Sequence, residues 1–195
     1  AIATVCLVGF VRPPFPDWKS LLLIVVVGGA LQYGLLYVAY WLAQDVTPVT
    51  VANQLWIPLT SLFAFLLLGE RLSRAAAGGM AVAFAGVAWM TLDAHALVVA
   101  IAAGAAWALT TVVARRTTSI PPLKMQGLLA ASTLPIMAFG SAVFERGQWE
   151  AMRNATPLVW LSLLWAGVVS SVLATTLLFW LVQRREAGRV TPYLL

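Results

Sequence analysis

The segment VTVANQLWIPLTSLFAFLLLGERL (residues 49–72) decides the fold class. Its first twenty residues carry no charged side chain, and about twenty apolar residues is the length of α-helix that crosses a hydrocarbon core of about 30 Å. Gly69, Glu70 and Arg71 then end the apolar run. The segment therefore predicts a membrane-spanning helix over residues 49–68.

Five further apolar blocks of spanning length flank this segment, at residues 20–43, 76–92, 96–114, 123–144 and 158–182. Composition agrees with this pattern, because 62% of the 195 residues are hydrophobic and only 10% are charged, against about 25% in soluble domains. We predict an all-α membrane protein, a polytopic helical bundle with six complete spans. Apolar runs at residues 1–11 and 190–195 predict two partial spans, as in a chain cut at both ends.

The positions of the basic residues predict the orientation of the bundle. When the gaps between spans are assigned alternately to the two sides, only Arg146 and Arg153 fall on one side and ten of the twelve Lys and Arg residues fall on the other. Basic loops face the cytoplasm. The loops that contain Arg71, Arg115 and Arg184 are therefore expected to be cytoplasmic.

Several function classes lack the residues that they need. The net charge of +5 sits in short loops, so we expect no nucleic-acid partner. Cys6 is the single cysteine and His95 the single histidine, so no intrachain disulfide, catalytic triad or metal cluster can form. Ionisable groups lie only near the ends of the predicted spans, which argues against a membrane-embedded enzyme. We expect no catalytic residues, no metal and no cofactor.

Uncharged polar and aromatic residues inside the spans are the candidates for a binding site, because an amide in hydrocarbon must be satisfied or face a wet cavity. Pro58 removes a backbone donor and predicts a kink near Gln54. The candidate substrate-binding residues are Gln32, Tyr33, Tyr37, Gln54, Trp56, Pro58, Trp107, Ser171 and Thr175.

Each of these features also has a purely structural interpretation. The tyrosine stripe can be an interfacial belt, Pro58 a packing kink, and the hydroxyls of Ser171 and Thr175 can bond to carbonyls of their own helix. Two stripes of small residues are predicted to be packing faces. They are Gly79, Ala83 and Gly86 in one span, and Ala102, Ala106 and Thr110 in the next.

A weak internal repeat appears at an offset of 139 residues, where Tyr40-Trp41-Leu42-Ala43-Gln44 aligns with Phe179-Trp180-Leu181-Val182-Gln183 and Gly28 with Gly167. The two members run in opposite directions through the predicted membrane, as an inverted repeat requires. Repeats of this kind are typical of transporters.

Several motifs in order resemble the EamA-type repeat of the drug/metabolite transporter superfamily. They are Ala52 through Leu59 with its mid-span proline, Gly69-Glu70-Arg71-Leu72, the glycine-rich run from Gly79 to Val87, Trp107-Ala108-Leu109, and Glu186 through Pro192. The resemblance implies ten helices in two inverted five-helix repeats, of which residues 1–92 and 96–195 would be incomplete copies.

The resemblance also implies a function. We expect a multi-pass transporter of the bacterial inner membrane that exports small metabolites by alternating access, with a small solute and membrane lipid as its partners. Gln32 and Gln54 resemble positions of amino-acid exporters, whereas Trp56 departs from that branch, so drugs stay open as substrates. A nucleotide-sugar or lipid-linked-sugar transporter and a non-transporting assembly subunit are the alternatives, and both a monomer and a homodimer are compatible with the sequence.

Overall fold

The computed structural model describes residues 17–90 and 94–185, and every element in these ranges is a helix. The predicted all-α membrane fold is therefore confirmed. The predicted partial spans at residues 1–11 and 190–195 lie outside the described residues. In chain order the elements are α2 (Trp18–Leu23), η2 (Ile24–Leu31), α3 (Gln32–Leu42), α4 (Val46–Asn53), α5 (Trp56–Phe63), η3 (Ala64–Leu68), α6 (Arg74–Ala88), α7 (Ala94–Arg116), α8 (Pro122–Phe144), α9 (Gln148–Asn154), α10 (Pro157–Trp165), η4 (Ala166–Ala174) and α11 (Thr175–Arg184), where η denotes a π-helical segment.

Consecutive elements join into five helices that are long and apolar enough to cross a membrane. They are Trp18–Leu42, Val46–Leu68, Ala94–Arg116, Pro122–Phe144 and Pro157–Arg184. The predicted span at residues 76–92 corresponds to α6. This helix is shorter than expected, because it has only 15 residues and ends at Ala88. At 1.5 Å per residue it is about 22 Å long.

Gly69 ends η3 with a φ of 69°, so the predicted helix end at the Gly-Glu-Arg-Leu motif is confirmed.

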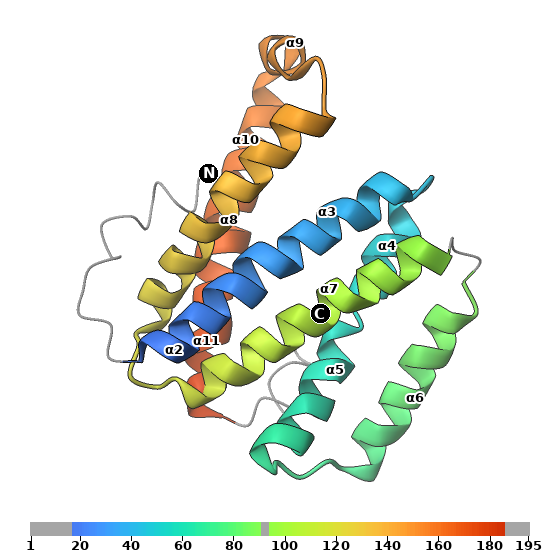
Figure 1. The fold of residues 1–195 in the computed structure, drawn as a ribbon, viewed down its shortest axis with the longest axis vertical. Helices are drawn as coiled ribbons and strands as arrows, with labels where there is room; N and C mark the ends of the chain where they lie inside the picture. Colours follow the sequence, from blue (N-terminus) through green and yellow to red (C-terminus); the bar gives the residue numbers. More distant parts are fainter. Residues whose placement is uncertain (1–16, 91–93, 186–195) are drawn as a thin grey trace.

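Helix α7 is the centre of the bundle, with α3, α4, α5, η2 and α11 packed against it (Figure 1). Its inward positions are mostly alanine, and Ala100, Ala103 and Ala108 are fully buried. Lipid gives helices no hydrophobic reason to associate, so close van der Waals contact must hold them together, and small side chains permit that contact. The packing stripe predicted in this span agrees with this arrangement, since Ala106 and Thr110 are buried.

Two adjacent glycines let η2 approach α7 and α8. A Cβ atom on Gly28 would lie 2.5 Å from Cγ2 and 2.7 Å from Oγ1 of Thr110, and one on Gly29 would lie 2.0 Å from Oγ of Ser132. Because both γ atoms of the buried Thr110 face Gly28, rotation of the threonine cannot relieve the clash. The backbone of η2 therefore sits directly against both neighbouring helices.

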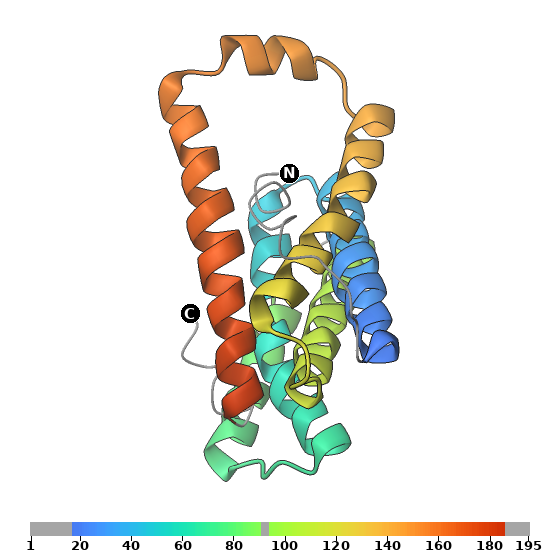
Figure 2. The same cartoon turned by 90° about the vertical axis from the view of Figure 1, so that its left-hand side faces the viewer.

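Helix α9 was not predicted. It lies across the end of the bundle and joins α8 to α10 (Figure 2). It follows Gly147, whose φ of 78° turns the chain, and it has seven residues, so its polar sequence carries too short a periodic pattern to be read as a helix. Trp149 and Met152 lie one turn apart on it and are exposed.

The substitution Gly28→Ala should destabilise the bundle by about 1–3 kcal/mol, as overpacking of a tight contact does. Gly34→Ala in the same span is the matched control, because a Cβ there meets no atom within 4 Å. Thermal unfolding of the purified protein in detergent should show a lower Tm for Gly28→Ala and an equal or higher Tm for Gly34→Ala. Equal stability of the two variants would contradict the proposed close approach of η2 to α7.

Candidate functional site

The second span is interrupted four residues before Pro58. Helix α4 ends at Asn53 and α5 begins at Trp56. In a continuous helix the carbonyl of Gln54 would accept from the N–H of residue 58, which proline lacks. That carbonyl instead accepts from the N–H of Ile57 at 3.1 Å. The predicted interruption is therefore present, and its polar backbone remains satisfied by a tighter turn.

A glycine of α7 allows this interruption to lie against the central helix. A Cβ on Gly104 would be 3.0 Å from the carbonyl oxygen of Asn53 and 3.3 Å from the backbone nitrogen of Trp56. Gly104 is buried. The break between α4 and α5 is thus packed onto the middle of α7, where Trp107 follows one turn later.

Three aromatic side chains from three helices form a row at this point. The rings of Trp56 and Trp107 meet edge to face with centroids 6.5 Å apart, and Trp107 and Phe179 have centroids 6.1 Å apart. The indole N–H of Trp56 donates to Oε1 of Gln54 at 3.0 Å. The structure therefore brings Gln54, Trp56 and Trp107 together, as three of the predicted site residues.

Phe179 is a member of this row that the site prediction missed. It is fully buried in α11. The internal repeat aligns Phe179 with Tyr40, but a phenylalanine in an apolar span carries no polar signal that distinguishes it from other core residues.

Tyr33 lies near the same region, and Gln32 precedes it in α3. Tyr33 and Trp107 both pack on one core cluster, which contains Phe179 and Leu129. Gln32 is 6% exposed, and its Oε1 has no hydrogen-bond partner among the described residues. A buried amide oxygen without a donor is rare, and among the described residues Gln32 shares this state with Asn53 and Gln126, so Gln32 is one of three amides available to a ligand.

Tyr37 lies apart from this row and contacts the end of α8. Its hydroxyl donates to Oε1 of Glu145 at 3.1 Å, and its ring packs on Phe144, with centroids 6.3 Å apart. The Tyr37 hydroxyl also lies 3.5 Å from the carbonyl oxygen of Gly140 on α8. Tyr37 therefore joins α3 to the end of α8, and no contact in the described part of the chain links it to Trp56 or Trp107.

Ser171 and Thr175 bond within their own helix. The hydroxyl of Ser171 donates to the carbonyl of Ala166 at 3.4 Å, and that of Thr175 to the carbonyl of Ser170 at 3.3 Å. This is the structural interpretation that the sequence left open. The backbone carbonyl of Ser171 also accepts from Nε2 of Gln126 at 2.5 Å, a contact that the sequence did not indicate.

An apolar cleft of about 670 Å³ lies between the second span and α6. Gln54, Pro58 and Ser61 line one wall. The opposite wall includes Gly79, Ala83 and Gly86, and a Cβ on either glycine would meet no atom within 4 Å. Among the described residues, Gly79 and Gly86 therefore face the cleft, which differs from the packing face predicted for this stripe, whereas Ala83 packs on the core cluster that contains Leu55 and Val87.

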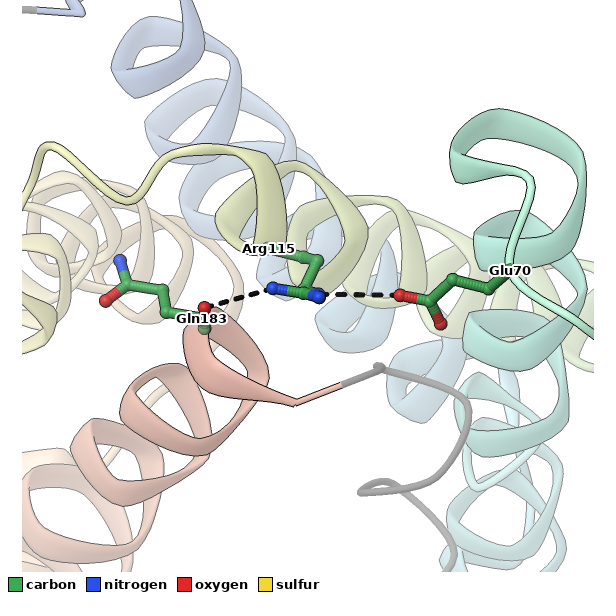
Figure 3. A network of polar contacts seen from close by, with 3 residues as sticks. All are labelled: Glu70, Arg115 and Gln183. Atoms are coloured by element: carbon green, nitrogen blue, oxygen red, sulfur yellow. Dashed lines mark hydrogen bonds and ion pairs between the residues drawn. The ribbon is translucent and has the colours of Figure 1, made fainter.

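An ion pair closes the end of the bundle that we predict to be cytoplasmic (Figure 3). Nε of Arg115 lies 3.4 Å from Oε1 of Glu70, and Nη1 of Arg115 donates to the carbonyl of Gln183 at 3.0 Å. Nε2 of Gln183 donates in turn to the carbonyls of Thr117 and Ile120. Glu70, which follows the end of the second span, therefore pairs with α7 across 45 residues of sequence.

Ionisable groups are confined to the ends of the described spans. Lysine and arginine occur there only in first or last turns, as Lys19, Lys124, Arg115, Arg116 and Arg184. Among the residues that the structure describes, no three His, Cys, Asp or Glu side chains are grouped as metal ligands would be. The interior thus offers aromatic faces and amides to a ligand, which suits binding by shape and hydrogen bonds.

The contact between Tyr37 and Glu145 should make stability depend on pH. The pKa of Glu145 is lowered, mainly because the Ser141 hydroxyl donates to its carboxylate and also because Tyr37 does. A lowered folded-state pKa gives stability above the unfolded value of about 4.3, which is lost as the pH falls through the folded value. Wild type should therefore lose more Tm than Glu145→Gln between about pH 6 and about pH 3. Equal losses in the two proteins would count against this contact.

Removal of the Arg115 guanidinium should open the end of the bundle shown in Figure 3. We expect Arg115→Gln to cost about 1–3 kcal/mol, since hydrogen bonds to charged groups contribute about that much and Glu70 is only 13% exposed. Arg71→Gln is the matched control, because Arg71 is exposed. Thermal unfolding in detergent measures the difference, and equal Tm values for the two variants would argue against a stabilising role.

Comparisons with known proteins agree with this architecture. A solved structure titled "Crystal structure of protein" superposes with a TM-score of 0.69 at 21% sequence identity, covering 99% of this chain and 72% of the other, which shows a shared fold. A comparison with curated proteins gives no match. The model of the EamA-like transporter family matches residues 95–195, just over half of the chain. The chain belongs to the EamA-like transporter family, whose members are membrane transporters of the drug/metabolite transporter superfamily.

Proposed function

We propose that this transporter exports small amphipathic metabolites, such as amino acids or related compounds and aromatic drugs, by alternating access. The proposed setting is a bacterial inner membrane, with the loops of Arg71, Arg115 and Arg184 in the cytoplasm. The family supports transport in general. The composition of the candidate site supports the proposed substrate class.

The observation that carries the proposal is the row of Trp56 and Trp107 beside Gln54. These side chains meet where the second span is interrupted, against the centre of α7. Both tryptophans are partly exposed, so a ligand can reach part of each ring. Aromatic faces beside a few amides suit a solute with an apolar body and a small polar group.

Charge supports a small solute over a sugar nucleotide. Phosphate recognition uses arginine or lysine, and in the described spans these residues lie only in terminal turns. The ammonium group of an amino acid needs no acidic partner in the site, because a tryptophan face attracts a cation within about 6 Å. We therefore favour amino-acid-like solutes over nucleotide sugars.

Contacts at the two ends of the bundle fit alternating access. At one end Arg115 joins Glu70 to Gln183, and at the other Tyr37 joins Glu145. The contacts of Glu70 with Arg115 and of Tyr37 with Glu145 each connect the proposed repeat of residues 1–92 to the proposed repeat of residues 96–195. Rocking of the repeats would open one set while the other stays closed.

Transport by the full-length protein in proteoliposomes tests the proposal, with radiolabelled cysteine, tryptophan and ethidium as probes. Wild type should transport at least one probe. Trp107→Ala should raise its KM about tenfold, which corresponds to about 1.4 kcal/mol and is the scale of a lost aromatic contact. Gln54→Ala should impair the same probe.

Trp165→Ala is the matched control, because Trp165 is 70% exposed on the outside of α10, and it should transport like wild type. If wild type and Gln54→Ala alike transport none of the probes, the proposal fails and a non-transporting assembly subunit becomes the better explanation. Equal KM values for Trp107→Ala and Trp165→Ala would remove Trp107 from the site.

A further inference from the structure

Two spans contain a long π-helical segment near mid-span. They are η2 (Ile24–Leu31) in the first span and η4 (Ala166–Ala174) in the last. The repeat offset of 139 carries residues 24–31 onto 163–170, so the two segments overlap in the proposed repeat. π-helical turns are rare, and single-turn π-bulges within α-helices are found frequently at functional sites. Their equivalent positions point to a shared role.

Helix α8 lies between these two spans and donates side-chain hydrogen bonds to the backbone of both (Figure 2). Toward η4, Nε2 of Gln126 donates to the carbonyl of Ser171 at 2.5 Å. Toward η2, Ser132 donates to the carbonyl of Val25 at 3.3 Å and Thr133 to that of Gly29 at 3.4 Å. A π-helical carbonyl can accept from the N–H five residues on, and it has a second lone pair, so the side chains of α8 add a bond between helices.

We propose that α8 is the pivot of the transport cycle, that η2 and η4 are its two hinges, and that Gln126 is the positioning residue that holds η4 in the state seen here. This inference rests on the proposed alternating-access function. It adds a residue and a moving part that neither the sequence nor the family comparison indicates.

The two sides of α8 differ in how easily they can release their partner. The hydroxyls of Ser132 and Thr133 also bond to the carbonyl of Leu129, each at 2.8 Å. A hydroxyl has one proton, so each proton is shared between a carbonyl of η2 and the carbonyl of Leu129 in α8. When η2 moves away, each hydroxyl can still donate to Leu129. Release of η2 from α8 therefore leaves no donor unpaired.

The bond from Gln126 to η4 has no such alternative. Gln126 is 3% exposed, and its Nε2 makes one described hydrogen bond, to Ser171. Separation of η4 would leave a buried amide without that partner, which is costly. Its Oε1 already lacks a partner in the described ranges, a cost that a purely structural residue would not be expected to carry. We therefore assign η2 as the contact that releases first and η4 as the contact that is held.

Distance measurements by double electron–electron resonance test the pivot without any substrate. The full-length protein, with Cys6→Ser, carries spin labels at Val38→Cys on α3 and Leu161→Cys on α10, both exposed positions. In lipid nanodiscs, Gln126→Met should shift the ratio of the distance populations about fivefold away from the wild-type state, the effect of one lost hydrogen bond.

Ser162→Ala is the matched control, because its hydroxyl bonds only to the carbonyl of Leu158 in its own helix among the described contacts, and its distances should equal those of wild type. Thr133→Val is the second variant, and it should shift the same ratio if Gln126→Met does not fold. Unchanged distances in every folded variant overturn the pivot, even if Tm falls. Because no substrate is present, a protein that transports none of the probes can still show the shift, so the two proposals fail separately.

Discussion

The rule that every backbone polar group must be satisfied inside the hydrocarbon governs this structure. Three spans deviate from an ideal α-helix, the first in η2, the second at Pro58 and in η3, and the last in η4, and hydrogen bonds accompany the deviations at Pro58, η2 and η4. The carbonyl of Gln54 accepts from Ile57, while side chains of α8 donate to carbonyls of η2 and η4. Irregular backbone in the spans therefore occurs where a nearby turn or a neighbouring helix supplies a donor, and the break at Pro58 is the irregular point that contains Gln54 and Trp56.

Small side chains on α7 allow the break in the second span and the segment η2 to pack closely against this central helix. Alanines and Gly104 on α7 admit the break between α4 and α5, and Gly28 admits η2 from the other side. Trp107 is the large exception on this helix, and it fills the space between Trp56 and Phe179. A single aromatic among small residues can reach two neighbouring helices, which explains how one side chain comes to join three spans.

Apolar blocks and breakers predict much of the fold from the sequence. Block length identified the spans, and Pro58 and Gly69 located an interruption and a helix end. Features that depend on partners far along the chain could not be predicted in this way. The pairing of Glu70 with Arg115, the contact of Tyr37 with Glu145 and the bond from Gln126 to Ser171 span 45 or more residues. The π-helical turns have no period of their own in an apolar run, and the stripe on α6 does not reveal that Gly79 and Gly86 face a cleft while Ala83 packs on the core.

The bond between Trp56 and Gln54 fixes the polarity of the proposed site. An indole nitrogen can only donate, so the atom that it contacts must be the amide oxygen of Gln54, and the amide of that side chain cannot be turned around. With its acceptor end engaged, Gln54 presents its NH₂ group outward. In the proposed site, a solute that reaches this glutamine would be oriented with a carbonyl or carboxylate toward it and its hydrogen-bearing groups elsewhere.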